Sequence, residues 1–421
     1  MTNDKGGMHV VYLYADSAME WNCSNWRCHL LSNAINYAHE ANPKTFPATA
    51  SMYLLQSALQ LDHPRVQSQI GVADVIVFQR NVITEEVWSA MDYWRALGKT
   101  VLVDLDDHYP NIPASNPAFN YWIGNVLGLD PKPVERLSEG LKRADGLLSP
   151  SRVILDDWKD TVPGYWWPNY PSLKDYEKIM PKRGGPDMAF DYDVTDPANP
   201  KLITKPREGT EGHIMIGWGG SISHVDSFVY SGVVEGLRKV LEELPNVFFK
   251  FCGHEGRLNY LFDKLPKDKV IRQIGVLPRD WPMVVSGFDI GLAPLDMREA
   301  DDNTGGRNQG FSYDERRSWL KLVEYICGGV PFVATDAAPY QPLKRFGKLA
   351  ANTPEAWYEA LKSMALGLKW FREDADKARA EGLKKYTIEN NAKQLVDLYD
   401  KIGIETQVRR MGAKLPNCIY V

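Results

Sequence analysis

The sequence has few of the features that mark metal centres, secreted proteins or membrane proteins. Its five cysteines form no Cys-x-x-Cys pair and its eight histidines show no His-x-x-x-His spacing, so we expect no disulfide framework and no zinc site. No run of about 18 uncharged apolar residues is present, which argues against a membrane span. The first residues lack a basic segment followed by an apolar one, so we expect a cytoplasmic protein.

Charge and motif content exclude further classes. The net charge of −5 gives no general attraction to phosphate backbones, which disfavours tight DNA binding. Neither a Walker-type phosphate loop nor a Gly-x-Ser-x-Gly nucleophile elbow is present. A length of 421 residues, 44% of them hydrophobic, is too great for one compact core and predicts two domains.

Strand candidates alternate with amphipathic segments through both halves of the chain. In the first half they lie at residues 9–14, 75–78, 100–104 and 146–150. In the second half they lie at residues 213–216, 247–252, 270–273, 288–293 and 331–335. This alternation predicts an α/β fold of two Rossmann-like, doubly wound domains that face a central cleft.

The pattern stops between residues 170 and 211, a segment rich in Pro, Gly and Asp. We therefore expect an N-terminal domain over residues 1–169, a linker or excursion over 170–211 and a C-terminal domain over 212–385. Residues 386–421 are expected to form a helical tail that can pack back on the N-terminal domain.

A helix predicted to start at Ser318 carries charges suited to a nucleotide diphosphate. Arg317, Lys321 and Glu324 fall at i, i+4 and i+7, so they share one face near the helix start. Cations and free amides at a helix start bind phosphate, and a carboxylate one turn on can accept hydrogen bonds from a ribose diol. The alternative is a surface salt bridge between Lys321 and Glu324 without further role.

A glycine-rich segment follows the first strand of the second half. Gly219, Gly220 and Ser221 precede His224, and glycines let backbone amides approach a phosphate without a Cβ clash. A plain tight turn is the alternative.

Acidic residues follow the strand at 100–104. Asp104, Asp106 and Asp107 come just before His108. Carboxylates at a strand's carboxyl end can orient an acceptor hydroxyl or take its proton, can cap turns, or can hold a divalent metal as an Asp-x-Asp. The residues alone leave these three interpretations open.

The run that begins at Glu324, Glu-Tyr-Ile-Cys-Gly-Gly-Val-Pro-Phe-Val-Ala-Thr, resembles the C-terminal motif of retaining GT-B glycosyltransferases of the family-4-like group. The resemblance places Glu324 on the donor ribose. Arg316 stands where the family carries an earlier glutamate. One branch has Asn-x-x-Lys-Ser-x-x-Lys instead, to which Asp314, Arg317, Ser318 and Lys321 are similar.

Three shorter segments resemble the same family. Residues 217–224 are similar to its Gly-Trp-x-Gly-Ser segment before a histidine, which implies donor binding by Gly219, Gly220, Ser221 and His224. Asn25-Trp-Arg27 resembles an entry motif whose arginine faces the cleft. The Asp-x-Asp-Asp from Asp104 resembles an acceptor-side motif of the branch.

The resemblance implies an enzyme that transfers a hexose or pentose from a nucleotide-diphosphate sugar to an acceptor hydroxyl, without bound cofactor or required metal. It implies retention of the anomeric configuration, and inversion with Asp107 as the base is the alternative. Arg317 and Lys321 then stabilise the departing diphosphate, and Asp106, Asp107 and His108 act near the acceptor, for which a glycan is favoured and a modified DNA base stays open. A non-catalytic nucleotide-sugar or glycan binder and a nucleotide-sugar epimerase are alternatives. Residues 296–313 form either a lid or a simple connection.

Overall fold

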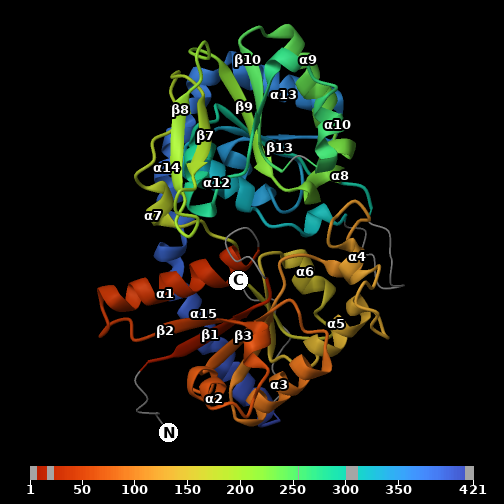
Figure 1. Ribbon diagram of the computed structural model, residues 1–421, viewed down its shortest axis with the longest axis vertical. Helices are drawn as coiled ribbons and strands as arrows, with labels where there is room; N and C mark the ends of the chain where they lie inside the picture. Colours follow the sequence, from red (N-terminus) through yellow and green to blue (C-terminus); the bar gives the residue numbers. More distant parts are fainter. Residues whose placement is uncertain (1–6, 17–22, 255, 300–311, 413–421) are drawn as a thin grey trace.

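The computed structural model describes residues 7–16, 23–254, 256–299 and 312–412. Two lobes lie one above the other, and each is built on its own six-stranded sheet (Figure 1). Every strand pair in both large sheets is parallel. The predicted fold class, α/β with two Rossmann-like domains, is confirmed.

The N-terminal sheet has the strand order β2-β1-β3-β4-β5-β6. Its strands are β1 His9–Tyr14, β2 Thr49–Leu54, β3 Val75–Gln79, β4 Thr100–Asp104, β5 Gly146–Ser149 and β6 Gly164–Trp166. The helices of this lobe are α1 Leu30–Ala41, α2 Pro64–Ile70, α3 Glu85–Ala96, α4 Phe119–Trp122, α5 Pro133–Leu141 and α6 Arg152–Asp157. All side chains of β3, β4 and β5 are buried, as expected of parallel strands covered on both faces.

The C-terminal sheet has the order β11-β10-β9-β12-β13-β14. Its strands are β9 Ile214–Gly220, β10 Val247–Gly253, β11 Val270–Gln273, β12 Ile290–Ala293, β13 Phe332–Thr335 and β14 Lys348–Ala350. The helices of this lobe are α8 Val225–Tyr230, α9 Val233–Glu243, α10 Asn259–Phe262, α11 Trp281–Ser286, α12 Leu320–Gly328, α13 Pro354–Leu366 and α14 Leu368–Lys385. Gly232, with φ of 80°, separates α8 from α9.

The segment between the lobes and the C-terminal helix both have defined structure. Residues 170–211 contain α7, Leu173–Tyr176, and an antiparallel hairpin of β7, Met188–Asp193, and β8, Lys201–Pro206. Helix α15, Ile388–Arg410, leaves the upper lobe and packs beside α1 on the N-terminal sheet (Figure 1). Its buried residues Leu395 and Tyr399 join the core around Val10 and Tyr12.

The order of the strands reverses direction at one point in each sheet. In the N-terminal sheet this point lies between β1 and β3, and in the C-terminal sheet between β9 and β12. Ligands of open α/β sheets bind beyond the carboxyl ends of the strands at such points. The segments after β1, β3, β9 and β12 are therefore where a site is expected.

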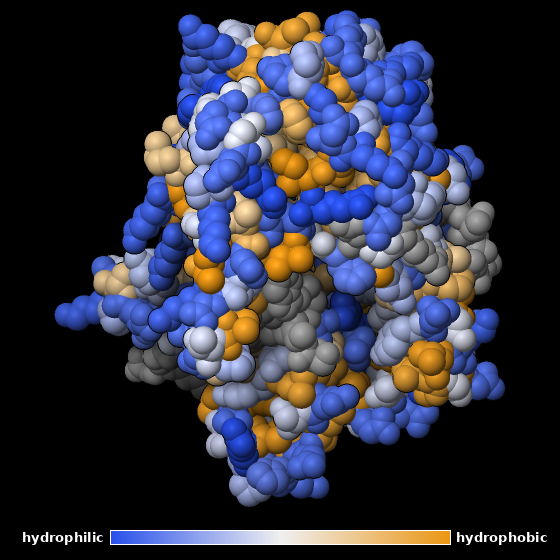
Figure 2. Space-filling view, turned by 45° about the horizontal axis from the view of Figure 1, so that its top comes forward, coloured by the Kyte–Doolittle hydropathy of each residue, from blue (hydrophilic) through white to orange (hydrophobic). Residues whose placement is uncertain are grey.

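The outer surface is mostly polar. Figure 2 shows hydrophilic side chains over most of one face, with hydrophobic ones in separate groups. Among the described residues, no helix combines the length and apolar character needed to cross a bilayer.

Candidate active site between the lobes

Helix α12 begins two residues later than the sequence suggested. Its first residue is Leu320, and Arg317 lies before it in an extended conformation, with φ of −70° and ψ of 163°. The expectation that Arg317, Lys321 and Glu324 share one helical face is therefore wrong in detail. Arg317 approaches from the preceding segment, because the chain turns at Asp314–Arg316, a single turn of 3₁₀ helix, before entering α12.

Lys321 connects α12 to the end of β9. Its Nζ donates a hydrogen bond to the carbonyl oxygen of Gly219 at 2.6 Å and lies 5.2 Å from the centre of the Trp218 ring. Burial lowers the pKa of Lys321, and the neighbouring Glu324 carboxylate opposes that effect. The ammonium is thus held at the carboxyl end of β9, and it does not serve as a surface ion pair.

Glu324 is enclosed one turn further along α12. The residue is 5% exposed, and the side chain of Trp281 hydrogen-bonds to it. Burial raises the pKa of Glu324 to about 7, although Lys321 and Trp281 both act in the opposite direction. A carboxyl group with this pKa ionises near neutral pH. A ligand that donates hydrogen bonds to it stabilises the ionised form.

The glycines belong to the end of β9 and do not form a separate turn. A Cβ on Gly219 would lie 2.0 Å from the Trp281 ring, and one on Gly220 would lie 2.8 Å from the Trp218 ring. Both positions therefore require glycine for packing. Ser221 follows as an exposed residue whose Oγ accepts a hydrogen bond from the amide of Ser223 at 3.3 Å.

His224 lies between these glycines and the cations. Its ring contacts Trp218 edge to face at 5.6 Å. Burial lowers the pKa of His224 well below its usual value, and Arg317 and Lys321 add to the effect, so the imidazole is neutral. Its buried Nδ1 has no hydrogen-bond partner within the described parts of the chain.

Arg317 brings the two lobes together. Its Nε is 3.2 Å from Asp314 Oδ1, its Nη2 donates to the carbonyl oxygen of Ser223 at 3.3 Å, and its Nη1 lies 3.7 Å from Oδ1 of Asp107 in the N-terminal lobe. The guanidinium also lies 5.1 Å from the centre of the Tyr313 ring. One cation thus faces both the end of β9 and the acidic segment after β4.

Asp106 and Asp107 lie on the N-terminal side of the contact with Arg317, the place that we call the interlobe gap. Burial raises the pKa of Asp107, while Arg317 opposes the rise and Asp106 adds to it. The hydroxyl of Tyr109 donates to Asp106 Oδ1 at 3.1 Å. Both carboxyl groups retain partial exposure, in contrast to the buried Asp104.

Sequence reasoning missed Arg80, which follows β3 at the switch point. It adopts φ of 42°, an unusual conformation for a residue other than glycine, and such strain is concentrated at functional sites. Its guanidinium is ion-paired with Asp16 at the end of β1. Asp106 and Tyr109 also act on it electrostatically. No sequence motif points to Arg80, and it is the positive φ of its backbone in the folded chain that draws attention to it.

His108 is buried where the lobes meet, and its partner is Asp157 of its own lobe. Its Nε2 lies 3.4 Å from Oδ2 of Asp157 in α6, and the same carboxylate accepts from Arg316 Nε at 2.6 Å. Burial, followed by the charge of Arg316, lowers the pKa of His108 well below its usual value. With 4% of its surface exposed, His108 is placed at the contact between the lobes.

Arg27 and Asp104 form an enclosed ion pair. Their side chains are 0% and 1% exposed, with Nη2 and Oδ2 2.8 Å apart. We expected both residues to contact an acceptor, but their side chains are enclosed. Each one is the ion-pair partner that the other needs when its charge is buried. Arg27 also donates to Oδ1 of Asn169 at 2.8 Å, and Asn169 Nδ2 donates to Ser318 Oγ at 3.1 Å. The pair thus positions a contact to the start of α12.

The part of the chain that the structure describes contains no group of three or more His, Cys, Asp or Glu residues arranged to hold a metal ion. Of the segment 296–313, proposed above as a lid or connection, residues 300–311 lie outside the described residues.

Comparisons with known proteins give structural matches only. No protein-family model and no curated protein sequence matches the chain. A sucrose-phosphate synthase from Thermosynechococcus elongatus matches with a TM-score of 0.58 and 12% identity, over 94% of this chain and 100% of that one. The Anabaena protein HepE, solved with UDP-glucose, matches with a TM-score of 0.56 and 12% identity, over 94% and 100%.

A third solved structure gives the same result. The O-GlcNAc transferase of Thermobaculum terrenum matches with a TM-score of 0.53 and 12% identity, over 97% of this chain and 69% of that one. The likeness to all three extends through both lobes. The chain therefore has the GT-B fold, in which two Rossmann-like domains face each other across a cleft.

Proposed function

We propose that the protein is a glycosyltransferase that takes a sugar from a nucleotide-diphosphate donor and transfers it to an acceptor hydroxyl. The observation that carries the proposal is the convergence of Arg317, Lys321 and Glu324 with the Gly219 end of β9 at the interlobe gap. Two cations and one carboxylate in this order match a diphosphate and the ribose next to it. The UDP-glucose held by HepE supports this class of donor.

The donor side supplies charge stabilisation without a metal. When the bond between the sugar carbon and the diphosphate oxygen breaks, negative charge grows on the β-phosphate. Arg317 and Lys321 are fixed before the donor binds, so they stabilise that charge with little reorganisation. Glu324 accepts hydrogen bonds from the ribose and sets the position of the sugar.

The acceptor side lies across the gap. Asp107, 3.7 Å from Arg317, faces the place where the sugar carbon is exposed, so it can orient the attacking hydroxyl or accept its proton. Asp106 and Arg80 hold Asp107 in a balanced charge environment. The resemblance to retaining enzymes favours retention of the anomeric configuration, which NMR of the product tests directly.

A second candidate function is non-catalytic binding of a nucleotide sugar. One observation favours it: Arg316 occupies the position of the family's earlier glutamate, and it forms an ion pair with Asp157 where the lobes meet. The enzyme and the binder share the same donor surface and differ only in turnover.

Incubation with a panel of nucleotide sugars separates these candidates. A transferase releases nucleotide diphosphate slowly in water and faster with its acceptor, whereas a binder releases none. In the enzyme, Glu324→Ala should raise the donor KM at least about tenfold, because a buried carboxylate that binds the ribose is lost. An unchanged donor KM in that variant contradicts the assignment.

A further inference from the structure

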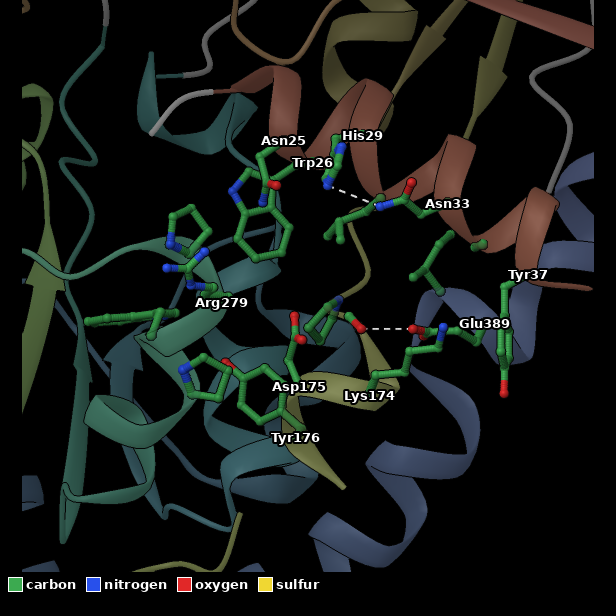
Figure 3. Close-up of a pocket in the computed structure, with 18 of the residues that line it drawn as sticks. Asn25, Trp26, His29, Asn33, Tyr37, Lys174, Asp175, Tyr176, Arg279 and Glu389 are labelled. Atoms are coloured by element: carbon green, nitrogen blue, oxygen red, sulfur yellow. Dashed lines mark hydrogen bonds between the residues drawn. The ribbon is translucent and has the colours of Figure 1, made fainter. Parts of the chain in front are cut away.

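A separate pocket of about 450 Å³ lies between the lobes next to the Glu324 surface (Figure 3). One wall is formed by η2, a turn of π-helix over Asn25–His29, and by α1. The other walls come from α7, the start of α15 and residues 278–282. The side chains that matter for the argument are Trp26, His29, Asn33, Tyr37, Asp175 and Arg279.

The first wall is one continuous face of η2 and α1. Trp26, Asn33 and Tyr37 recur at helical spacing, while Leu31 and Ile35 on the opposite face are buried in the core. From Trp26 to Tyr37 the chain advances about 16 Å at the rise of a helix, which exceeds the size of a single sugar ring. Figure 3 shows Trp26 at one end of the pocket and Tyr37 at the other.

The charges around the pocket disfavour an anionic ligand. Glu40, Asp175 and Glu389 line it, against the cations Lys174 and Arg279. Both cations have other contacts, since Lys174 lies 3.5 Å from the centre of the Tyr37 ring and Arg279 donates to the carbonyl oxygen of Pro200 at 2.8 Å. Glu389 is occupied as well, since it accepts from Ser172 Oγ and from the Leu173 amide at 2.7 Å. A phosphorylated or acidic ligand would therefore meet the carboxyl groups of Glu40 and Asp175 and two cations that already have partners.

The remaining groups suit hydroxyl-rich, uncharged molecules. The indole of Trp26 offers a flat surface for the apolar face of a sugar ring. The amide of Asn33, which contacts His29 at 3.0 Å, can both donate to and accept from hydroxyl groups. The carboxyl group of Asp175 points into the middle of the pocket in Figure 3 and can accept from a diol.

Two residues at the pocket also contact residues of the interlobe gap. Cys23, two residues before η2, hydrogen-bonds Asp106 on the acceptor side. Trp281 lines the pocket and also hydrogen-bonds Glu324 on the donor side. The pocket therefore adjoins both the acceptor side and the donor side of the gap, so a saccharide bound in it would lie next to them.

We propose that the pocket between α1, α7 and α11 binds a neutral oligosaccharide, the part of the acceptor remote from the reacting hydroxyl. The role of this saccharide as acceptor rests on the proposed function, whereas its binding to the pocket does not.

Saturation-transfer NMR with maltotriose, cellotriose and triacetylchitotriose tests the proposal, with trigalacturonic acid as the anionic counterpart. At least one neutral trisaccharide should bind the wild type and bind Trp26→Ala about tenfold more weakly. Trp370→Ala is the matched control, because Trp370 is 60% exposed and lies outside the pocket. Asn33→Ala, at an exposed position, provides a second variant whose folding is not at risk.

The proposal is overturned if no neutral trisaccharide binds, if Trp26→Ala and Asn33→Ala both bind as tightly as Trp370→Ala, or if trigalacturonic acid binds equally well. Thermal shifts with nucleoside diphosphates, measured on the same samples, separate the two claims. If nucleoside diphosphates raise the Tm but no neutral trisaccharide binds, only the proposed saccharide site is overturned. Saccharide binding without any nucleotide response overturns the proposed function alone.

Discussion

The ammonium of Lys321 and the carbonyl oxygen of Gly219 are joined by a hydrogen bond of 2.6 Å. Lys321 belongs to the first turn of α12, and Gly219 to the end of β9, one of the two strands that flank the switch point of the C-terminal sheet. The cation is thereby positioned before any ligand arrives, which is the condition for effective charge stabilisation.

Gly219→Ala should disrupt the donor surface through Trp281. The added Cβ would lie 2.0 Å from the Trp281 ring, and that side chain hydrogen-bonds Glu324. We expect the Kd for the nucleotide to rise at least about tenfold and stability to fall by about 1–3 kcal/mol from overpacking. Calorimetry measures the first and urea unfolding the second. Gly185→Ala is the control, because nothing lies within 4 Å of its Cβ position; equal affinities in the two variants would contradict the site.

Nucleotide affinity should depend on the ionisation of Glu324. Burial raises its pKa to about 7, and a ribose diol donates hydrogen bonds to the carboxylate form, so binding should strengthen as pH rises through 7. Between pH 6 and 8 this amounts to about tenfold. Glu324→Gln should lose this part of the dependence, while titration of the nucleotide's own phosphate affects both proteins alike. Identical pH profiles would show that Glu324 does not bind the ligand.

The contact between Arg316 and Asp157 should stabilise the arrangement of the lobes. Their side chains are 0% and 5% exposed, and removal of one partner from a buried ion pair costs about 3–5 kcal/mol. Arg316→Met should lower the urea midpoint far more than Arg238→Met, which breaks an exposed pair with Glu242 worth at most about 1 kcal/mol. Arg316→Met/Asp157→Leu should recover part of the loss. Equal midpoints for the two single variants would refute this role.

Asp107→Asn should separate transfer from donor binding. Asp107 faces Arg317 from the opposite lobe, across from the end of β9 where we propose that the donor binds. We expect kcat for transfer to fall about 10²–10⁴-fold, in the range of general acid–base effects, with donor Kd changed less than about threefold. Stopped assays and calorimetry on the same variant give both numbers. A large change in the donor Kd with an unaltered kcat would contradict this prediction and would indicate that Asp107 acts in donor binding.

The strands that the sequence predicts well are those buried on both faces. The segments at 75–78 and 100–104 are continuous apolar runs, and they became β3 and β4 with shifts of at most one residue. The missed β2 has the mixed sequence TASMYL and is only partly buried, and β7 and β8 lie in the polar excursion. These segments contain no continuous apolar run of the kind that marks a strand covered on both faces.

The candidate site divides in the same way. Lys321 and Glu324 lie in one short motif, so their spacing is visible in the sequence. Arg80, Trp281 and Asp157 join the site through contacts between residues far apart in the chain, and no local pattern indicates them. The family resemblance singled out Arg27 but did not indicate its surroundings. In the fold Arg27 is enclosed and paired with Asp104.

The central claim is that the start of α12 binds a diphosphate next to a ribose. Calorimetric titration with matched nucleoside diphosphates and monophosphates of several bases tests it, using wild type, Lys321→Met and the exposed control Lys267→Met. We expect at least one diphosphate to bind wild type and Lys267→Met at least about tenfold more tightly than its monophosphate, and Lys321→Met to lose this preference. Absence of diphosphate binding, or an equal preference in all three proteins, would contradict it.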